Sequence, residues 1–483
     1  MAEIGKARKD GIHIIEEAAA IAQVKLGMED LDAQAVDTFN HSKSRSPIAL
    51  ELFDRYGVKR GLRNENGSGV LVGLTDIAEV HSYLVDDNER IPVEGRLYYR
   101  GIDVDQLVSG FYEKKRFGFE ETAFLLILGE LPSEPELAEF EACLASHRQL
   151  PDSFLEDHIL KNPSRDIMNK MSRSVLNLYA RDQFADTISP ENVYLQSMKL
   201  IARFPALAAY GYMAKAHYMD KKSLFIHDPK PEYNTAQNLL HMIRSDGQFT
   251  ELEARILDLA LVLHADHGGG NNSTFTVRAV TSTGTDTYSA IAAAMGSLKG
   301  PQHGGASGKA FDMMKDLKAN VQNRRSEPEI ADYLRRVLRK EAFDRSGLIY
   351  GVGHAVYTLS DPRTKLLRDY ARQLAYESGY EDDYELYITT EKLALQVFRE
   401  VKQTDRAICA NVDFYSGFVY KMLGIPEELY TPIFAVARIA GWCAHRLEEL
   451  ISGGKIMRPA YKSVAKRRPY TEMEARNPEI GIE

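Results

Sequence analysis

The sequence has few cysteines, and the three that it has are scattered. Cys143, Cys409 and Cys443 lie far apart among 483 residues, and none belongs to a CxxC motif. Disulfide frameworks and most zinc or thiol-redox sites need cysteines that are paired or clustered. The sequence therefore predicts three packed thiols and a protein that works in the reducing cytoplasm.

The chain also lacks a long apolar run and an excess of positive charge. No stretch approaches the ~20 consecutive apolar residues of a membrane span. Near the N-terminus, Glu16 and Glu17 interrupt the apolar run, which is not typical of a secretory signal or a transit peptide. The net charge of −9 at pH 7 argues against a general affinity for nucleic acid or for an anionic membrane. Apolar residues make up 44% of the chain and charged residues 27%, as in soluble globular proteins.

Strand signals are sparse, and helical periodicity dominates. Ser133-Glu-Pro-Glu136 is a capping box that predicts a helix start, and Leu252–Leu263 repeats apolar residues at helical spacing. Further helices are predicted at Ala290–Leu298, Glu329–Leu338, Thr390–Lys402, Phe414–Met422 and Pro432–Leu450. The best β signal is a hairpin of Val70–Val85 and Val93–Tyr99 around Asp86–Asn88. With no strand–helix alternation, the chain is predicted to be all-α with a minor β-hairpin towards the N-terminus.

Three glycine-bearing segments carry residues suited to acid–base chemistry. The first, His264–Ser307, begins HADHGGG and ends near GPQHG; the others are Gly351–Arg363 (GVGHAVYTLSDPR) and Asn411–Gly417 (NVDFYSG). Histidine titrates near neutrality, and glycine lets the backbone come close to a ligand. The candidate catalytic residues are His303, His354 and Asp413. With a nearby arginine, they indicate chemistry on an anionic substrate.

Each of these residues has an ordinary alternative when it is considered alone. Asp413 stands at the start of a helical pattern and could be an N-cap. His303 and His354 could be loop histidines, and a single arginine is more often part of a surface ion pair.

A metal-dependent hydrolase built on His264, Asp266 and His267 is a more remote alternative. HADH spaces two histidines three residues apart with an acid between them, but it lacks HExxH spacing and an evident third ligand. A phosphate loop at Gly268–Gly270 fails on context, because it follows a helical pattern and lacks the Lys-Ser/Thr pair.

The motifs in this order resemble citrate synthase. GPQHG is followed by GVGHAV with Arg363 nine residues past its histidine, then by NVDFYSG, and HADH lies 36 residues before GPQHG. The segment Pro92–Leu107, PVEGRLYYRGIDVDQL, also resembles this family. The likeness runs from about Gly69 to the C-terminus, and the first 60 or so residues carry little of it.

The resemblance implies a discontinuous architecture. Residues 1–304 and 425–483 are expected to form a large helical domain, and residues 305–424 a smaller inserted helical domain. The active-site cleft would lie between them, so that hinge closure would assemble the site.

It also implies the reaction and the roles. The enzyme would condense acetyl-CoA with oxaloacetate and hydrolyse citryl-CoA to citrate and CoA, at the entry to the tricarboxylic acid cycle, with neither a cofactor nor a metal. Asp413 would be the base, His303 the donor to the thioester oxygen, and His354 the acid for the oxaloacetate carbonyl. The residues matching oxaloacetate-binding positions are His267, Asn271, Ser273, Arg363, Arg438 and Arg458. Arg458 would reach across from the partner subunit of a homodimer.

Two positions depart from the family pattern. Gly268 follows HADH where the family usually has an acid, which puts the register of Asn271 in question. Thr358 stands where many members place a basic residue for the CoA phosphates, and the Lys466-Arg467-Arg468 run is a candidate replacement. The alternative within the family is 2-methylcitrate synthase, which uses propionyl-CoA, because one methylene changes pocket affinity by only about 1–3 kcal/mol.

Overall fold

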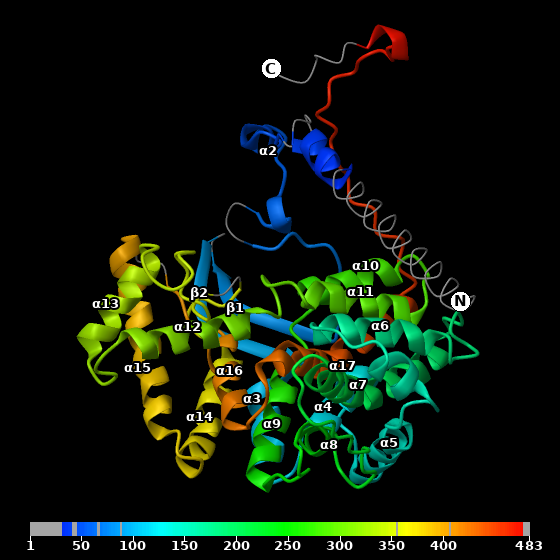
Figure 1. The fold of residues 1–483 in the computed structure, drawn as a ribbon, viewed down its shortest axis with the longest axis vertical. Coiled ribbons are helices and arrows are strands. Elements are labelled where there is room, and N and C mark those ends of the chain that lie inside the picture. The colour runs from blue at the N-terminus through cyan, green and yellow to red at the C-terminus, as the bar shows by residue number, and fades with distance from the viewer. Residues whose placement is uncertain are drawn as a thin grey trace, which may run out of the picture. The chain divides into compact units, whose positions relative to one another are not determined.

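The computed structural model describes residues 31–40, 46–64, 68–86, 89–353, 356–404 and 407–476. The chain divides into two compact units, one made of Met1–Leu71 with Pro459–Glu483 and the other of Val72–Arg458. Helices dominate the ribbon (Figure 1), so the predicted all-α class is confirmed.

The first unit contains only short elements among its described residues. Residues 31–40 are helical, followed by α2 (Leu50–Arg55), the 3-10 turn η2 (Arg60–Leu62) and, near the C-terminus, η5 (Met473–Ala475). Neither α2 nor the two 3-10 turns bury a residue. This unit therefore has no apolar core in the part that is described.

The second unit holds the core and every predicted site residue that the structure describes. Its helices are α3 (Val104–Tyr112), α4 (Phe119–Leu128), α5 (Glu134–His147), α6 (Ile167–Tyr179), α7 (Pro190–Tyr218), α8 (Thr235–Ile243), α9 (Glu251–His264), α10 (Asn272–Thr281), α11 (Thr287–Leu298), α12 (Ala306–Asn320), α13 (Glu327–Leu338), α14 (Pro362–Glu377), α15 (Glu381–Lys402), α16 (Asp413–Met422) and α17 (Tyr430–Ile451), with the π-helical turn η3 (Leu155–Leu160) and the 3-10 turn η4 (Glu427–Leu429).

Helix α17 is the centre of this unit. It packs against α4, α7, α9 and α10, and Trp442 and Cys443 on it are completely buried. In Figure 1, α12, α13, α15 and α16 gather on one side of α17, and α5 and α6 lie on the other. The first group falls within the predicted inserted domain, residues 305–424. The two compact units do not coincide with that domain boundary, which stays a prediction.

Local signals account for several helix starts. Ser133 N donates to Glu136 Oε2 at 2.8 Å, and the two residues form the predicted capping box of α5. Thr250 and Glu253 form another at the start of α9, with Thr250 N donating to Glu253 Oε2 at 2.7 Å. Satisfying these amide groups sets where each helix begins.

Some helix bounds differ from the prediction. Helix α15 begins at Glu381 rather than Thr390, because its first turn is Glu381-Asp382-Asp383, which favours a helix N-terminus but breaks the apolar periodicity. Helix α7 was not predicted. It is buried on nearly every side from Val193 to Ala216, so its sequence lacks the contrast between a polar and an apolar face.

The predicted β-hairpin is present. Strands β1 (Ala78–Asp86) and β2 (Glu89–Tyr99) pair antiparallel, and β3 (Ile102–Asp103) adds to β2. The expected start at Val70 was wrong, since pairing begins at Ala78. Of the predicted turn, only Asp86 lies within the described residues.

The three cysteines are packed as predicted. Cys409 and Cys443 are buried, and Cys143 is half-buried against the core. Burial raises the pKa of both buried thiols to about 12, so they remain protonated and unreactive. Across the described ranges, no helix combines the length and apolarity that crossing a membrane requires.

Candidate active site

The HADH segment begins where α9 ends. His264 is the last residue of α9, and its Nδ1 donates to the carbonyl oxygen of Ala260 at 2.7 Å. Burial, helped by the positive charges of Arg363 and Arg438, lowers the pKa of His264 to about 3. His264 is therefore a neutral residue that supports the helix end.

His303 meets the residues that follow the HADH segment. Its Nε2 lies 3.1 Å from both Asn271 Oδ1 and Ser273 Oγ, and Trp442 Nε1 donates to the same serine oxygen at 3.1 Å. Asn271 is the N-cap of α10, which fixes its position at the start of that helix. Gly268 had put the register of Asn271 in question, and the structure places Asn271 next to His303. Burial, followed by the charge of Arg438, lowers the pKa of His303 to about 4, so this imidazole is neutral at physiological pH.

Asp413 is the first residue of α16, and the N-cap alternative is wrong. The cap position is Val412, one residue before Asp413. Asn411 supplies the local hydrogen bond, with its Oδ1 accepting from Asp413 N at 3.0 Å. Burial raises the pKa of Asp413 to about 6, although the charges of Arg363 and Arg438 act in the opposite direction.

The segment leading to His354 pairs with the segment leading to Asp413. Gly353 N donates to Cys409 O at 2.8 Å, and Asn411 Nδ2 donates to Gly353 O at 2.8 Å. Gly351 has φ +79°, and a Cβ there would collide with Phe414. His354 itself lies outside the described residues, but its chain neighbour Gly353 is held beside the start of α16.

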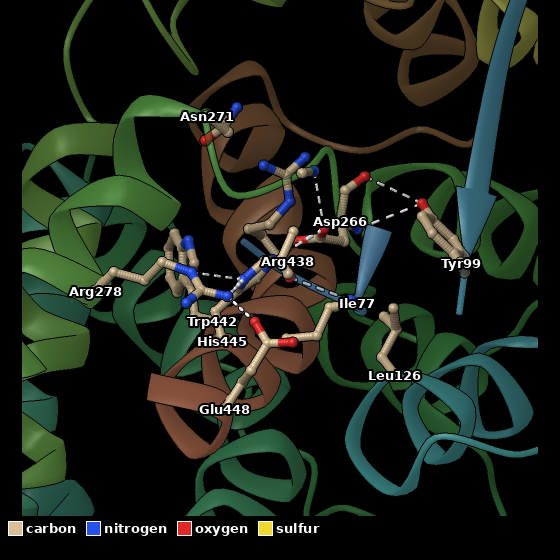
Figure 2. A network of polar contacts seen from close by, with 12 residues as sticks. Ile77, Tyr99, Leu126, Asp266, Asn271, Arg278, Arg438, Trp442, His445 and Glu448 are labelled. Carbon is tan, nitrogen blue, oxygen red and sulfur yellow. Dashed lines mark hydrogen bonds and ion pairs between the residues drawn. The ribbon is translucent and has the colours of Figure 1, made fainter. Parts of the chain in front are cut away.

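Two arginines place positive charge in the same region. The carboxylate of Asp361 accepts from Arg363 Nε at 3.0 Å and from Nη2 at 2.8 Å, which fixes the guanidinium. Arg438 is completely buried, and its Nε donates to His264 O at 2.7 Å. Its Nη1 and Nη2 meet no hydrogen-bond partner among the described residues. Figure 2 shows Arg438 on α17 beside Asp266.

These charges act on common targets. Arg438 influences the pKa of His264, His303 and Asp413, and Arg363 influences that of His264 and Asp413. The structure thus brings a half-buried carboxylate of raised pKa, a neutral imidazole and two buried cations into one electrostatic neighbourhood.

A family model described as "Citrate synthase, C-terminal domain" matches residues 66–460. The chain belongs to the citrate synthase family. The citrate synthase of Deinococcus radiodurans is 35% identical over 394 residues, which are 81% of this chain and 95% of that protein. The 2-methylcitrate synthase of Shewanella oneidensis is 30% identical over 378 residues, 77% of this chain and 90% of that protein. The crystal structure of citrate synthase from Pyrobaculum aerophilum has a TM-score of 0.69 at 28% identity, covering 84% of this chain and 94% of that one.

The resemblance read from the motifs is therefore confirmed. The chain is an acyltransferase of the citrate synthase family, an enzyme of the tricarboxylic acid cycle, and citrate synthase is better supported than 2-methylcitrate synthase.

The remaining predicted residues are placed as follows. His267 is half-buried, and its ring lies edge-on to that of Tyr357, with centroids 5.6 Å apart. Arg363 lies 6.0 Å from the same tyrosine ring. Tyr357 thus lies beside both His267 and Arg363, two residues predicted to bind oxaloacetate in this member of the citrate synthase family. Arg458 is exposed at the end of the second unit and makes no hydrogen bond or ion pair within the described parts of the chain.

The β-hairpin supports the loop that follows His354. Ser82 Oγ donates to Val356 O at 3.0 Å, and Gly95 N donates to Ser360 Oγ at 3.1 Å. A Cβ on Gly95 would collide with Ser360 and Tyr357, so only glycine allows the strand this close. The PVEGR part of the family resemblance therefore has a structural reason.

The geometry gives no support to the metal-hydrolase alternative. The imidazole of His264 is bonded to Ala260 O, and Asp266 Oδ2 lies 3.2 Å from His445 Nε2. Within the described residues, no group of three or more metal-ligating side chains converges.

Sequence reasoning missed several residues that build this site. Asp361 holds Arg363, and the DPR motif carried that signal because an aspartate two residues before an arginine can reach its fork. Trp442 and His445 were also missed. Their spacing from Arg438, four and seven residues, places them on one face of a helix and could have indicated a shared target.

Proposed function

We propose that the chain condenses acetyl-CoA with oxaloacetate and hydrolyses citryl-CoA to citrate and CoA. One observation carries this proposal: two nitrogens of the buried Arg438 guanidinium have no partner among the described residues, and its charge acts on Asp413, whose pKa is about 6. A carboxylate ligand would satisfy the first group, and the second is a base poised near neutral pH.

Oxaloacetate is the substrate that the cations suit. Arg438 offers two terminal nitrogens to one of its two carboxylates, Arg363 adds a second positive charge for the other, and both Arg363 and His267 lie near the ring of Tyr357. Arg363 keeps Nη1 for a ligand, because Asp361 occupies only its Nε and Nη2. Oxaloacetate and acetyl-CoA are substrates rather than cofactors, and we propose that the enzyme needs no cofactor.

Asp413 would remove a methyl proton from acetyl-CoA, and His303 would stabilise the enolate oxygen. The hydroxyl of Ser273 can donate to Asn271 Oδ1 or to His303 Nε2. When it donates to His303, the proton of the neutral imidazole sits on Nδ1 and is available to the thioester oxygen. The low pKa of His303 keeps it a neutral donor throughout.

His354 would protonate the oxaloacetate carbonyl as the enolate attacks. Its assignment rests on the GVGH motif, and the pairing of Gly353 with Asn411 supports it by holding the histidine's chain neighbour beside the Asp413 segment. Water would then hydrolyse the citryl thioester and release CoA.

The acyl donor is tested by steady-state kinetics with acetyl-CoA and propionyl-CoA at saturating oxaloacetate. We expect kcat/KM to be higher with acetyl-CoA. A higher value with propionyl-CoA would assign the chain as a 2-methylcitrate synthase. No turnover of either thioester would contradict the proposal as a whole.

We also propose a cytoplasmic homodimer in which Arg458 completes the partner's site. Arg458 is exposed and has no partner among the residues that the structure describes, which supports a role outside its own chain. Arg458→Ala and His303→Ala subunits should each be inactive, and mixing them should restore part of the activity, because one site of each heterodimer would carry neither change. Activity is measured after subunit exchange shown by native mass spectrometry. No recovery would mean that Arg458 does not act in trans.

A further inference from the structure

His445 occupies a completely buried position between two charged residues from other segments. Its Nε2 lies 3.2 Å from Asp266 Oδ2, and its Nδ1 lies 3.1 Å from Arg278 Nε and 2.8 Å from Arg278 Nη2 (Figure 2). Asp266 immediately precedes His267, and Arg278 belongs to α10, which starts after the glycine-rich loop. His445 therefore connects the two ends of the segment that carries His267.

The partners determine the tautomer of this imidazole. A guanidinium can only donate, so Nδ1 of His445 must accept from Arg278 and carry no proton. The proton of the neutral ring is then on Nε2, which donates to Asp266. His445 accepts from one side and donates to the other, so its orientation is fixed.

Asp266 connects His445 to the backbone on the other side of His267. Its Oδ2 also accepts from Gly268 N at 2.9 Å, while its backbone oxygen accepts from the Tyr99 hydroxyl at 3.1 Å. Gly268 has φ +78°, a conformation that suits glycine. The residues on both sides of His267 are thus held by one carboxylate. Burial alone would raise the pKa of Asp266, but His445, Arg438 and the Gly268 N–H together lower it, so the group is a carboxylate.

Arg278 anchors the other side. It forms ion pairs with Glu448 and Glu449 of α17, the second at 3.1 Å. On the same helix, Gly441 leaves room for Ala265 and Asp266, which a Cβ would displace. One face of α17 therefore packs against the HADH segment at Ala265 and Asp266, forms ion pairs with Arg278 of α10 and carries Arg438.

We infer that His445 is a positioning residue for oxaloacetate, which sets His267 relative to Arg438 by bridging Asp266 and Arg278. The inference rests on the proposed function. If His267 is a ligand of oxaloacetate, loss of the bridge should weaken binding of this substrate more than it changes later steps.

The test compares His445→Leu with His445→Gln. Leucine fills the space but removes both hydrogen bonds, whereas the glutamine amide can accept from Arg278 and donate to Asp266. Arg278 keeps Glu448 and Glu449, and Asp266 keeps Gly268, so the leucine variant retains partners for both charges. Should it not yield folded protein, His445→Asn replaces it, because the shorter amide reaches Arg278 but not Asp266. Arg446→Leu is the stability control. That buried arginine donates hydrogen bonds to Thr281, Thr285 and Thr287, which lie outside the HADH segment.

Oxaloacetate binding is measured by calorimetry, and both KM values and kcat by steady-state kinetics. We expect His445→Leu to raise the oxaloacetate Kd and KM about tenfold, with His445→Gln within about twofold of wild type. The acetyl-CoA KM at saturating oxaloacetate should change little, and Arg446→Leu should lower the melting temperature without the oxaloacetate effect.

Two results would overturn the inference. One is unchanged oxaloacetate binding in His445→Leu, or in His445→Asn if that variant is used. The other is an equal loss in His445→Gln or Arg446→Leu, which would indicate a general effect on folding. Failure of the proposed function is distinguishable, because wild-type protein would then neither bind oxaloacetate nor form citrate.

Discussion

Replacing Asp413 with asparagine should lower kcat for citrate formation by about 10²–10⁴-fold, the usual contribution of a positioned base. The amide keeps the size of the side chain but cannot take a proton from the acetyl methyl group. Oxaloacetate binding, measured by calorimetry, should stay nearly unchanged, because the base acts only on the acyl donor. A variant within about tenfold of wild-type kcat would show that Asp413 is not the base.

The pH dependence should report the same group. The reaction needs the Asp413 carboxylate, whose pKa is raised to about 6, so the rate should fall as pH decreases through about 6. His303 has a pKa of about 4 and should stay neutral over that range. A pH–rate profile of kcat/KM, which reports the groups of the free enzyme, checks this. A rate that stays constant from pH 7.5 to 5 would contradict the assignment.

Replacing Arg438 with methionine should raise the oxaloacetate Kd by two to three orders of magnitude. Removing one partner of a buried charge pair costs about 2–5 kcal/mol, and each 1.4 kcal/mol is tenfold. Arg438→Lys should retain part of the affinity, because an ammonium keeps the charge but loses the planar fork. Calorimetric titration with oxaloacetate measures both variants.

The same substitution should not lower thermal stability. Burial lowers the pKa of Arg438 to about 10, which means that the folded protein disfavours its charged form, and two of its nitrogens have no partner among the described residues. Methionine removes that cost, and it also removes the hydrogen bond to His264 O and the charge that helps to keep Asp266 ionised, so the melting temperature of Arg438→Met should stay close to that of wild type. A clearly destabilised variant, or one that binds oxaloacetate within about threefold of wild type, would refute the role of a dedicated ligand-binding guanidinium.

Much of the fold was predictable where the signal is local. The capping box at Ser133 and Glu136 and the hairpin of β1 and β2 depend on residues close together in the chain, and both are present. The bounds of α15 and the existence of α7 were missed. Charged first turns and helices buried on all sides lack the periodicity on which such predictions depend.

Asp413 shows where sequence reasoning about the site ended. Its position before a helical pattern favoured an N-cap, and only the motif NVDFYSG indicated a base. The structure excludes the cap, because Val412 holds that position, and burial raises the pKa of the carboxyl group. Burial is a property of the packed chain, so no local pattern could have provided it.

The sequence by itself determined the family, the all-α class and the candidate residues, because glycine-flanked motifs are short and keep their order along the chain. Tertiary structure alone decided which of those residues share an environment and which unpredicted residues support them. Arg438 bonds His264 across 174 positions, and His445 meets Arg278 across 167. The physical reason is that hydrogen bonds and desolvation depend on distance in space, which packing around α17 sets and sequence spacing does not.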